Sequence, residues 1–495
     1  MRLARNFAAG IAQTVITTLV ALAVVPLYIR YLGIEAYGLI GFNATLQAVL
    51  HILELGLGQA ISREVARGLA SDDMPRTRDV LRSAARIYWL VALLIGLAFF
   101  VAAPVIADRW ISPGTIGRDT VSSAVLLMGL MIACRWPSGL YTGALIGAHR
   151  LTVSSALAVV YILIANLGAV LVLAFWSATI EAFFIWQAGC ALLYTVATQW
   201  AAWGIVGGGS DAKFDLGALR SIWRFSAGMT GIALTSIILS QLDKLILSTL
   251  LPLAEFGRYM LATAVAMALY GVVSALFKVL YPHFSARVAA GNEEGLRLEY
   301  RAITNLLGIV WFPGTMTLIL CAEPLLLLWT GSAAIAADTA PLLMLLTAGT
   351  ALHGIMYLPI SLQLAYGMTR LPLTINLALM VLQVPLIVVL ALRFGAAGGA
   401  AAWLALHALY FTFGTWIVHR RILKGIAARW MLRDAGVPLA ASAAFGAAGA
   451  FLISRLGASL PVHLAIGAGA GLAAFAAAAS LCPYRPRQIR ALLTG

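Results

Sequence analysis

The chain has 495 residues, of which 62% are hydrophobic and only 11% are charged. Soluble domains contain roughly 45–50% apolar and about 25% charged residues, so this composition excludes a soluble protein and indicates a polytopic membrane protein. The net charge of +14 does not indicate nucleic-acid binding, because the basic residues lie in short loops beside apolar segments. The cysteines (Cys134, Cys190, Cys321 and Cys482) lack metal or disulfide spacing, and no cofactor is expected.

Apolar windows predict an all-α membrane protein with about 14 transmembrane helices. Their approximate residue ranges are 7–29, 38–61, 85–107, 119–146, 153–175, 182–206, 225–250, 258–282, 304–329, 339–366, 372–393, 397–419, 435–454 and 462–482. The first apolar run is too long for a signal peptide and is expected to be retained as a span. Arg30, near its outer end, either guards the exit of a transport path or anchors the helix at the membrane interface.

The second predicted span carries a polar stripe on an otherwise apolar helix. Asn43, Gln47, His51 and Glu54 fall within about 80° of one another on one face, and Gly58 shares that face. Hydrocarbon offers such groups no partners, so the stripe must face water or protein. We interpret it as the lining of a wet cavity, and the alternative is hydrogen bonding to a neighbouring helix.

Arg135 lies near the middle of the fourth predicted span, too deep to reach the interface easily. Trp136 and Pro137 follow it, which predicts a kink there. An arginine at this depth costs at least about 2.5 kcal/mol, so it needs water or a partner. It is the best candidate for binding a phosphate, and the structural alternative is a salt bridge to Glu54.

The seventh and later spans hold further candidates. Asp243 and Lys244 are adjacent and point about 100° apart, so they are not expected to pair with each other. Lys244 and Lys278 either bind cargo or extend to the nearest interface. Asn376 and Gln383 align on one face of the eleventh span, where they contact either sugar or a neighbouring helix. The segment over residues 420–434 is predicted to be an amphipathic helix lying on the membrane surface.

Basic residues also predict the topology. Lys and Arg number 24 on the side of the N-terminus and six on the other, and the remaining three lie within spans. Both termini are therefore expected in the cytoplasm. LGIEAYGLIGFNATL is echoed about 220 residues later by LPLAEFGRYMLATAV, in which Gly257 matches Gly38. Six spans separate the copies, so we expect a parallel repeat with substrate between two six-helix halves.

Three segments carry a resemblance to a known family: YLGIEAYGLIGF, LELGLGQAISREVARG and QLDKLILSTLLPLAEFGRYMLATA. They resemble the polysaccharide-transport branch of the MATE-like (MOP) exporter superfamily, and more narrowly the O-antigen flippases. The similarity covers the first 300 residues, whereas the last six spans match in layout and in the stretch GAAGGAAAWLALHALY. The resemblance implies two pseudo-symmetric six-helix lobes around a positively lined central cavity, plus two C-terminal helices.

The expected domains follow from the spans and this resemblance. They are an N-lobe over 1–206, a cytoplasmic linker over 207–224, a C-lobe over 225–419, an interfacial linker over 420–434, and the last two helices with a cytoplasmic tail over 435–495. The implied function is translocation of polyprenyl-diphosphate-linked oligosaccharide, such as O-antigen repeat units, from the cytoplasmic to the outer leaflet of a bacterial inner membrane. A polysaccharide polymerase and a chain-length regulator are the implied protein partners.

The energy source is left open by the residues. No phosphate-binding GxxxxGK[ST] motif occurs, so coupling would use H⁺ or Na⁺. Glu54 and Asp243, one in each lobe, are the acids well inside spans, and a change in their protonation during the cycle would drive a proton antiport. The alternative is a downhill flippase in which both acids are permanently ion-paired.

Three other functions compete with the flippase. A multidrug exporter would prefer an acidic cavity for organic cations, and a lipid II flippase would differ mainly in cargo. A membrane glycosyltransferase or polysaccharide polymerase would need a sizeable loop beside a carboxylate, and the loops here are too short. The chain is therefore expected to be a carrier and not an enzyme.

Overall fold

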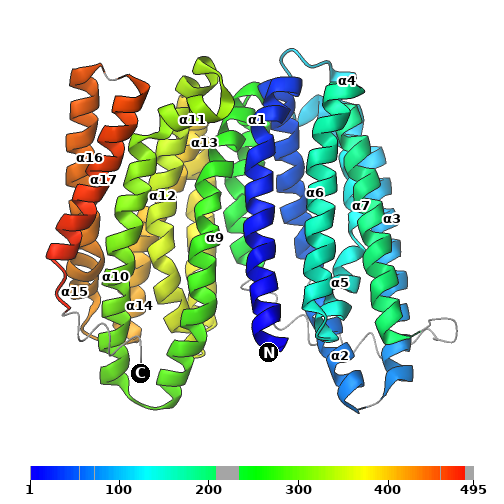
Figure 1. Ribbon diagram of the computed structural model, residues 1–495, viewed down its shortest axis with the longest axis horizontal. Helices are drawn as coiled ribbons and strands as arrows, with labels where there is room; N and C mark the ends of the chain where they lie inside the picture. The colour runs from blue at the N-terminus through cyan, green and yellow to red at the C-terminus, as the bar shows by residue number, and fades with distance from the viewer. Residues whose placement is uncertain (1, 55, 72, 208–233, 458, 485–495) are drawn as a thin grey trace. The chain divides into compact units, whose positions relative to one another are not determined.

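The computed structural model describes residues 2–54, 56–71, 73–207, 234–457 and 459–484, and these residues are almost entirely helical. The chain divides into two compact units, Met1–Gly257 and Arg258–Gly495, and in each of them the helices run side by side (Figure 1). Most of the expected linker over 207–224, the start of the seventh span and the C-terminal tail lie outside the described residues. The domain boundaries predicted from the sequence stay a prediction.

The helices confirm an all-α polytopic membrane protein. Eleven described helices are long and apolar enough to cross a membrane. Two of them each join two predicted spans across a non-helical glycine, Gly33 in one and Gly395 in the other. Counting each of these as two, and adding the helix over residues 234–250, gives the fourteen segments that hydropathy predicts.

The first unit contains the N-terminal helices and the beginning of α9. Its elements are α1 (Arg2–Leu50), the short 3-10 helix η1 (His51–Glu54), α2 (Leu57–Ser71), α3 (Met74–Arg109), α4 (Arg118–Arg135), α5 (Ser138–Gly147), α6 (Leu151–Phe175), α7 (Ile180–Val206), the helix over 234–250, and the start of α9 (Leu253–Ala289).

The second predicted span is not one continuous helix, which corrects the sequence prediction. The α-helical backbone ends at Leu50, tightens into η1, and resumes at Leu57 as α2. Gly56 stands at the break with a φ of +70°, a conformation that only glycine adopts at little cost. Hydropathy does not detect this break because glycine also occurs in regular membrane helices.

The fourth predicted span is also broken, at the position that its sequence indicates. Helix α4 ends at Arg135, and α5 begins at Ser138 after Trp136 and Pro137. Proline has no backbone N–H and disrupts the preceding turn, so the helical hydrogen bonding is interrupted there. The predicted kink is confirmed.

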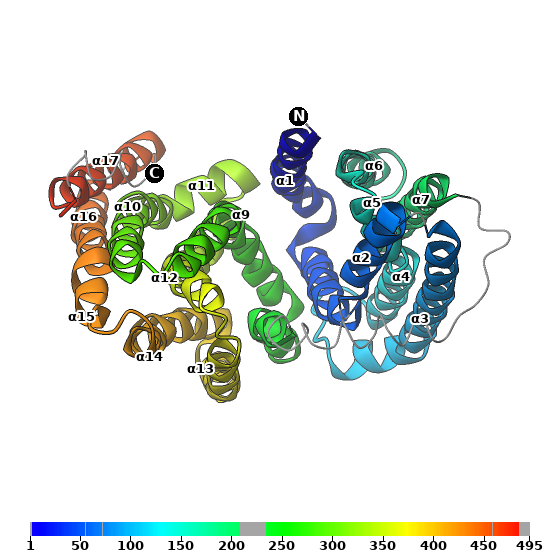
Figure 2. The same ribbon diagram turned by 90° about the horizontal axis from the view of Figure 1, so that it is seen from below.

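The segments beyond these two breaks, α2 and α5, lie next to each other in the first unit (Figure 2). A Cβ added to Gly143 would lie 2.3 Å from the backbone oxygen of Gly58, and one added to Gly147 would lie 2.1 Å from that of Ser62. Glycines four residues apart on α5 therefore let the two backbones approach closely, as small residues do between membrane helices.

The loop between α3 and α4 ties α1 to the start of α9. The buried carboxylate of Glu35 accepts hydrogen bonds from the backbone N–H groups of Gly114, at 2.6 Å, and Thr115, at 3.0 Å. Ser112 accepts a 2.9 Å hydrogen bond from the N–H of Leu253 in the same loop region. Helices α1 and α9 are also in direct contact, because a Cβ added to Gly38 would lie 2.6 Å from the backbone oxygen of Leu253.

The second unit holds the rest of α9 and the later helices. These are α10 (Glu293–Leu320), α11 (Ala322–Thr330), α12 (Ala333–Ala365), α13 (Arg370–Leu409), the π-helix η2 (Tyr410–Gly414), α14 (Thr415–Arg421), α15 (Ala427–Arg429), the π-helix η3 (Trp430–Ala435), α16 (Gly436–Leu456) and α17 (Leu460–Ser480). Its core gathers large apolar side chains such as Phe284, Tyr300 and Trp430.

The segment over 420–434 is not an amphipathic helix on the membrane surface, so that prediction is wrong. Positive φ angles at Leu423 and Gly425 break the helix, and Ile422, Ile426 and Trp430 are buried in the core together with Leu423. Trp430 is fully buried and its indole N–H donates a 2.8 Å hydrogen bond to Thr304. The spacing of apolar residues predicted a face buried in lipid, but in the structure those residues pack against the protein core.

A buried ion pair attaches this segment and the last two helices to α10. Arg301 donates to both carboxylate oxygens of Asp434, at 2.6 and 3.1 Å, and the Tyr484 hydroxyl donates to the same carboxylate at 3.1 Å. Asp434 is completely buried, and this pairing satisfies its charge. Helices α16 and α17 consequently pack against α10 (Figure 2).

Candidate functional site

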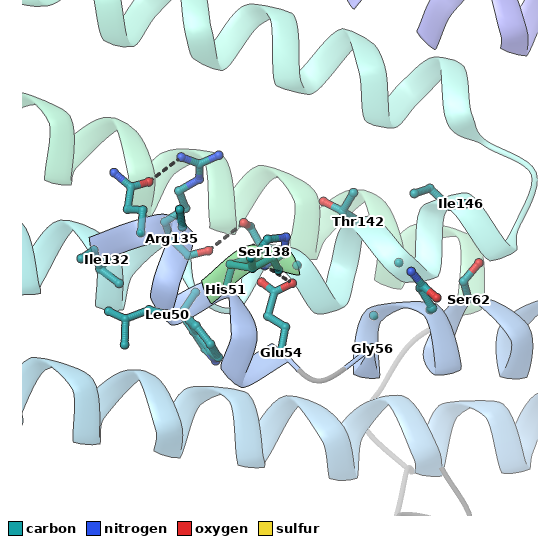
Figure 3. A pocket seen from close by; sticks show the side chains of 18 of the residues that line it. Leu50, His51, Glu54, Gly56, Ser62, Ile132, Arg135, Ser138, Thr142 and Ile146 are labelled. Carbon is teal, nitrogen blue, oxygen red and sulfur yellow. Dashed lines mark hydrogen bonds and ion pairs between the residues drawn. The ribbon is translucent and has the colours of Figure 1, made fainter. Parts of the chain in front are cut away.

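A cavity of about 810 Å³ lies within the first unit, at the level where two adjacent spans are broken. Its polar lining includes Gln47 from α1, His51 and Glu54 from η1, and Arg135 from the end of α4. Further lining residues come from α2, α5, α7 and the helix over 234–250; they are Gln59, Ser62, Ser138, Thr142, Tyr194, Leu234 and Ile237. Figure 3 shows the polar side chains converging on this space.

The helix breaks are what place these groups. Because α1 tightens into η1 and stops at Glu54, the last polar residues of the stripe lie at a helix end and not on a continuous cylinder. Because α4 stops at Arg135, its guanidinium also lies at a helix end. Discontinuous helices of this kind form the binding sites of many transporters, since irregular backbone within a membrane is tolerated where it lines a cavity.

Arg135 is the cation of the cavity. Its guanidinium donates a 2.9 Å hydrogen bond to Oε1 of Gln47, drawn as a dashed line at Arg135 in Figure 3. It also lies 5.4 Å from the ring centroid of Tyr161. The side chain is exposed to the cavity, although it lies within a membrane-spanning segment. Within the described part of the chain, one hydrogen bond uses only part of its donor capacity, so the planar fork of N–H groups can receive an anion.

Glu54 is the acid of the cavity. Its Oε2 lies 2.8 Å from Nδ1 of His51, and its Oε1 would be 2.6 Å from a Cβ at Gly139. The carboxylate therefore packs against the first turn of α5, where the helix dipole favours negative charge. The salt bridge between Glu54 and Arg135, which was the structural alternative for the arginine, is not formed among the described side chains.

The polar stripe of the second span is only partly a cavity lining. Gln47, His51, Glu54 and Gly58 line the cavity as predicted. Asn43 lies one turn further from the break and is buried, and its amide nitrogen is 3.8 Å from the sulfur of Met131 on α4. The stripe therefore lines the cavity at its end near the break, whereas Asn43 contacts a neighbouring helix.

Asp243 and Lys244 pair with each other, contrary to the prediction. Nζ of Lys244 lies 3.1 and 3.3 Å from the two carboxylate oxygens of Asp243 and 2.8 Å from the backbone oxygen of Ser240. Both side chains are buried. The angle between adjacent Cβ atoms was a poor guide because the long, flexible lysine stem folds back along the helix.

The other predicted residues are not part of the described lining of this cavity. Arg30 on α1 and Lys278 on α9 are exposed. Asn376 and Gln383 on α13 are buried in the second unit, and Gln383 is completely inaccessible. Contacts of these four residues with cargo stay predictions.

Sequence reasoning missed the glycines that hold the site together and two of its aromatic groups. Gly139, Gly143 and Gly147 repeat every four residues, which is the spacing that signals close helix contacts in membranes. Tyr161 and Tyr194 stack on each other with ring centroids 4.7 Å apart, and no local pattern distinguishes them from ordinary apolar residues.

The comparisons with known proteins agree with this architecture. The profile of the family described as "Polysaccharide biosynthesis protein" matches residues 3–287. A search of curated proteins gives no match. Among solved structures, "Lipid II flippase MurJ, inward closed conformation" matches with a TM-score of 0.65 and 12% identity, and the match covers 95% of this chain and 97% of that one.

Two further solved structures have the same fold. An "Inward-facing conformation of a multidrug resistance MATE family transporter of the MOP superfamily" matches with a TM-score of 0.64 and 16% identity over 81% of this chain and 94% of that one. A "MOP superfamily transporter from Pyrococcus furiosus" matches with a TM-score of 0.54 and 15% identity over 85% and 96%. The resemblance inferred from the sequence is confirmed, and at these identities the structures establish the fold alone.

Proposed function

Because the chain belongs to the polysaccharide biosynthesis protein family, we propose that it is a flippase for polyprenyl-diphosphate-linked oligosaccharides. The cargo, such as an O-antigen repeat unit, is moved from the cytoplasmic to the outer leaflet of a bacterial inner membrane by alternating access. The lipid tail stays in the bilayer during this step. The sugars and the diphosphate need a polar path, because hydrocarbon solvates them very poorly.

The observation that carries this proposal is an exposed arginine in a cavity at mid-span. Arg135 lies within the segment Arg118–Gly147, which is long and apolar enough to cross a membrane, yet its guanidinium faces an open space of about 810 Å³. Keeping a cation there is costly, which favours a functional role. A guanidinium binds phosphate oxygens in a bidentate manner, so a diphosphate is the group that fits it best.

The rest of the lining suits a carbohydrate. Gln47, Gln59, Ser62 and Thr142 offer amide and hydroxyl groups, and Tyr194 offers an aromatic face. Such groups exchange hydrogen bonds with sugar hydroxyls and pack against the apolar faces of sugar rings. An organic cation would be repelled by Arg135, which argues against a multidrug exporter. Lipid II remains the alternative cargo, since it shares the chemistry of a lipid-linked diphosphate.

Ion coupling is proposed to run through Glu54. Asp243, the other intramembrane acid expected to take part, is buried against Lys244, whereas Glu54 lines the cavity and can meet water or cargo. H⁺ is favoured over Na⁺, because Glu54 is the single acid among the described cavity residues and Na⁺ would prefer several oxygen ligands. The antiport expected from the sequence requires that proton and cargo exclude each other.

A transport assay tests the proposal directly. The full-length protein, reconstituted in liposomes, should speed the appearance in the opposite leaflet of a short-chain polyprenyl-diphosphate-linked sugar, detected with a sugar-modifying enzyme that cannot cross the membrane. Protein-free liposomes provide the background rate. Efflux of ethidium should stay at that background, because Arg135 repels an organic cation. Ethidium efflux without lipid transport would contradict the flippase and favour a multidrug exporter.

We also predict the orientation in the membrane. Cysteines introduced at the exposed positions Ser112 and Ser459 should react with a membrane-impermeant thiol reagent added outside intact cells, and one at Ser71 should react only after permeabilisation. The reason is that the loops on the side of Ser71 carry most of the Lys and Arg residues. Labelling of Ser71→Cys from outside would reverse the proposed topology, with both termini then outside.

A further inference from the structure

Glu54 lines the same cavity as Arg135, the residue proposed to bind the cargo diphosphate. Its Oε2 contacts Nδ1 of His51 at 2.8 Å, and its Oε1 reaches the first turn of α5 at Gly139, where the missing side chain leaves room for it. The N-terminal turn of a helix carries a partial positive charge that favours anions. A carboxylate of the protein itself therefore occupies a positively polarised corner of the cavity.

Titratable and charged groups from several neighbouring elements surround this carboxylate. His51 shares η1 with it, and Arg135 lines the same cavity from the end of α4. Tyr88 on α3 is buried, and Tyr194 lines the cavity from α7. All of these groups are cationic or neutral, so the acid has no like charge near it in the described lining until an anionic ligand arrives.

We propose that Glu54 is a resident anion, which holds the place of the cargo diphosphate in the empty carrier and takes up one proton from solvent when cargo binds. This inference rests on the proposed function, because it assumes a diphosphate on the cargo. An ionised carboxylate and a diphosphate in the same cavity repel each other. Proton transfer from water to a carboxylate oxygen of Glu54 removes that repulsion and releases His51 to face the phosphate.

Proton and cargo therefore bind together and do not exclude each other. Linkage requires that the proton raises the affinity for cargo by the same factor as cargo raises the affinity of Glu54 for the proton. This direction differs from the antiport expected from the sequence, in which the proton would displace the cargo. In the empty carrier, the negative charge of Glu54 offsets the positive charge of Arg135 in the same cavity, which limits binding of stray anions.

Binding measurements on the full-length protein in lipid nanodiscs test the inference. The probe is a short-chain prenyl-diphosphate-linked sugar, whose charge is constant near neutral pH because both of its phosphates are esterified. The native protein should bind it more tightly at about pH 6 than at about pH 8, and a pH indicator in weak buffer should report proton uptake on binding. Glu54→Gln should bind it at least about tenfold more tightly at about pH 8 and should take up no proton at this site.

Two further variants separate the possible outcomes. Glu64→Gln is the matched control, because Glu64 lies on α2 outside the cavity lining and pairs with Arg67, and it should behave like the native protein. Arg135→Ala should lose binding. If it binds normally, the proposed function itself fails. If Arg135→Ala loses binding but Glu54→Gln binds no more tightly and still takes up the proton, the resident anion alone is overturned. Glu54→Ala repeats the test should the glutamine variant fail to accumulate.

Discussion

Replacing Arg135 with alanine should abolish transport while leaving the protein folded. The guanidinium makes one 2.9 Å hydrogen bond to Gln47 and forms no ion pair among the described residues, so its removal strands no buried charge. A charge-assisted hydrogen bond contributes about 1.5–3 kcal/mol, and its loss should weaken diphosphate binding by at least about tenfold. The measurement is translocation of the prenyl-diphosphate-linked sugar in liposomes, together with the amount and melting temperature of the purified protein.

Two other substitutions make this result specific. Arg135→Lys should retain part of the activity, because a point charge attracts phosphate without the bidentate fork. Arg118→Ala is the matched control: Arg118 is an exposed arginine that begins the same span, 3.9 Å from Asp108, and its loss should change neither transport nor stability. Full activity in Arg135→Ala would end its role as the phosphate ligand. A misfolded Arg135→Ala would instead make the residue structural.

Hydropathy predicts the number and order of the spans because burial in lipid selects for long apolar segments regardless of their tertiary contacts. It does not predict where the helical backbone is interrupted. Pro137 marks one break, since proline cannot continue the hydrogen-bond pattern. The break at Gly56 carries no such mark, because glycine also occurs in regular membrane helices and its positive φ is visible only in three dimensions.

The candidate site is predictable to the extent that polar residues are rare in membrane spans. Gln47, His51, Glu54 and Arg135 stand out on that ground, and the structure brings them into one cavity. Partners are harder to predict than positions, because a side chain's reach depends on its rotamer. Asp243 and Lys244 demonstrate this: their backbone directions diverge, and the lysine stem still returns to the carboxylate. The role of Gly139 could not be predicted, because its contact with Glu54 is visible only in the structure.

The contact between α2 and α5 leads to the second large effect, on stability. A methyl group on Gly143 would lie 2.3 Å from the backbone oxygen of Gly58, which cannot move without shifting the whole of α2. Gly143→Ala should therefore force apart the two helices that border the cavity. Overpacking of this kind costs typically about 1–3 kcal/mol, and here it outweighs the higher helix propensity of alanine. We expect a lower melting temperature in detergent and weaker transport.

Gly189→Ala is the matched control for this prediction, because it makes the same change on a helix of the same unit. Nothing lies within 4 Å of a Cβ at Gly189, which is an exposed residue of α7. There the substitution adds helix propensity without a clash, so the melting temperature should stay the same or rise. Opposite signs for the two variants would mean that backbone contact at Gly143, and not the glycine-to-alanine change in itself, sets the stability. Equal melting temperatures would contradict the close packing of α2 on α5 and, with it, the fixed position of Glu54 against the first turn of α5.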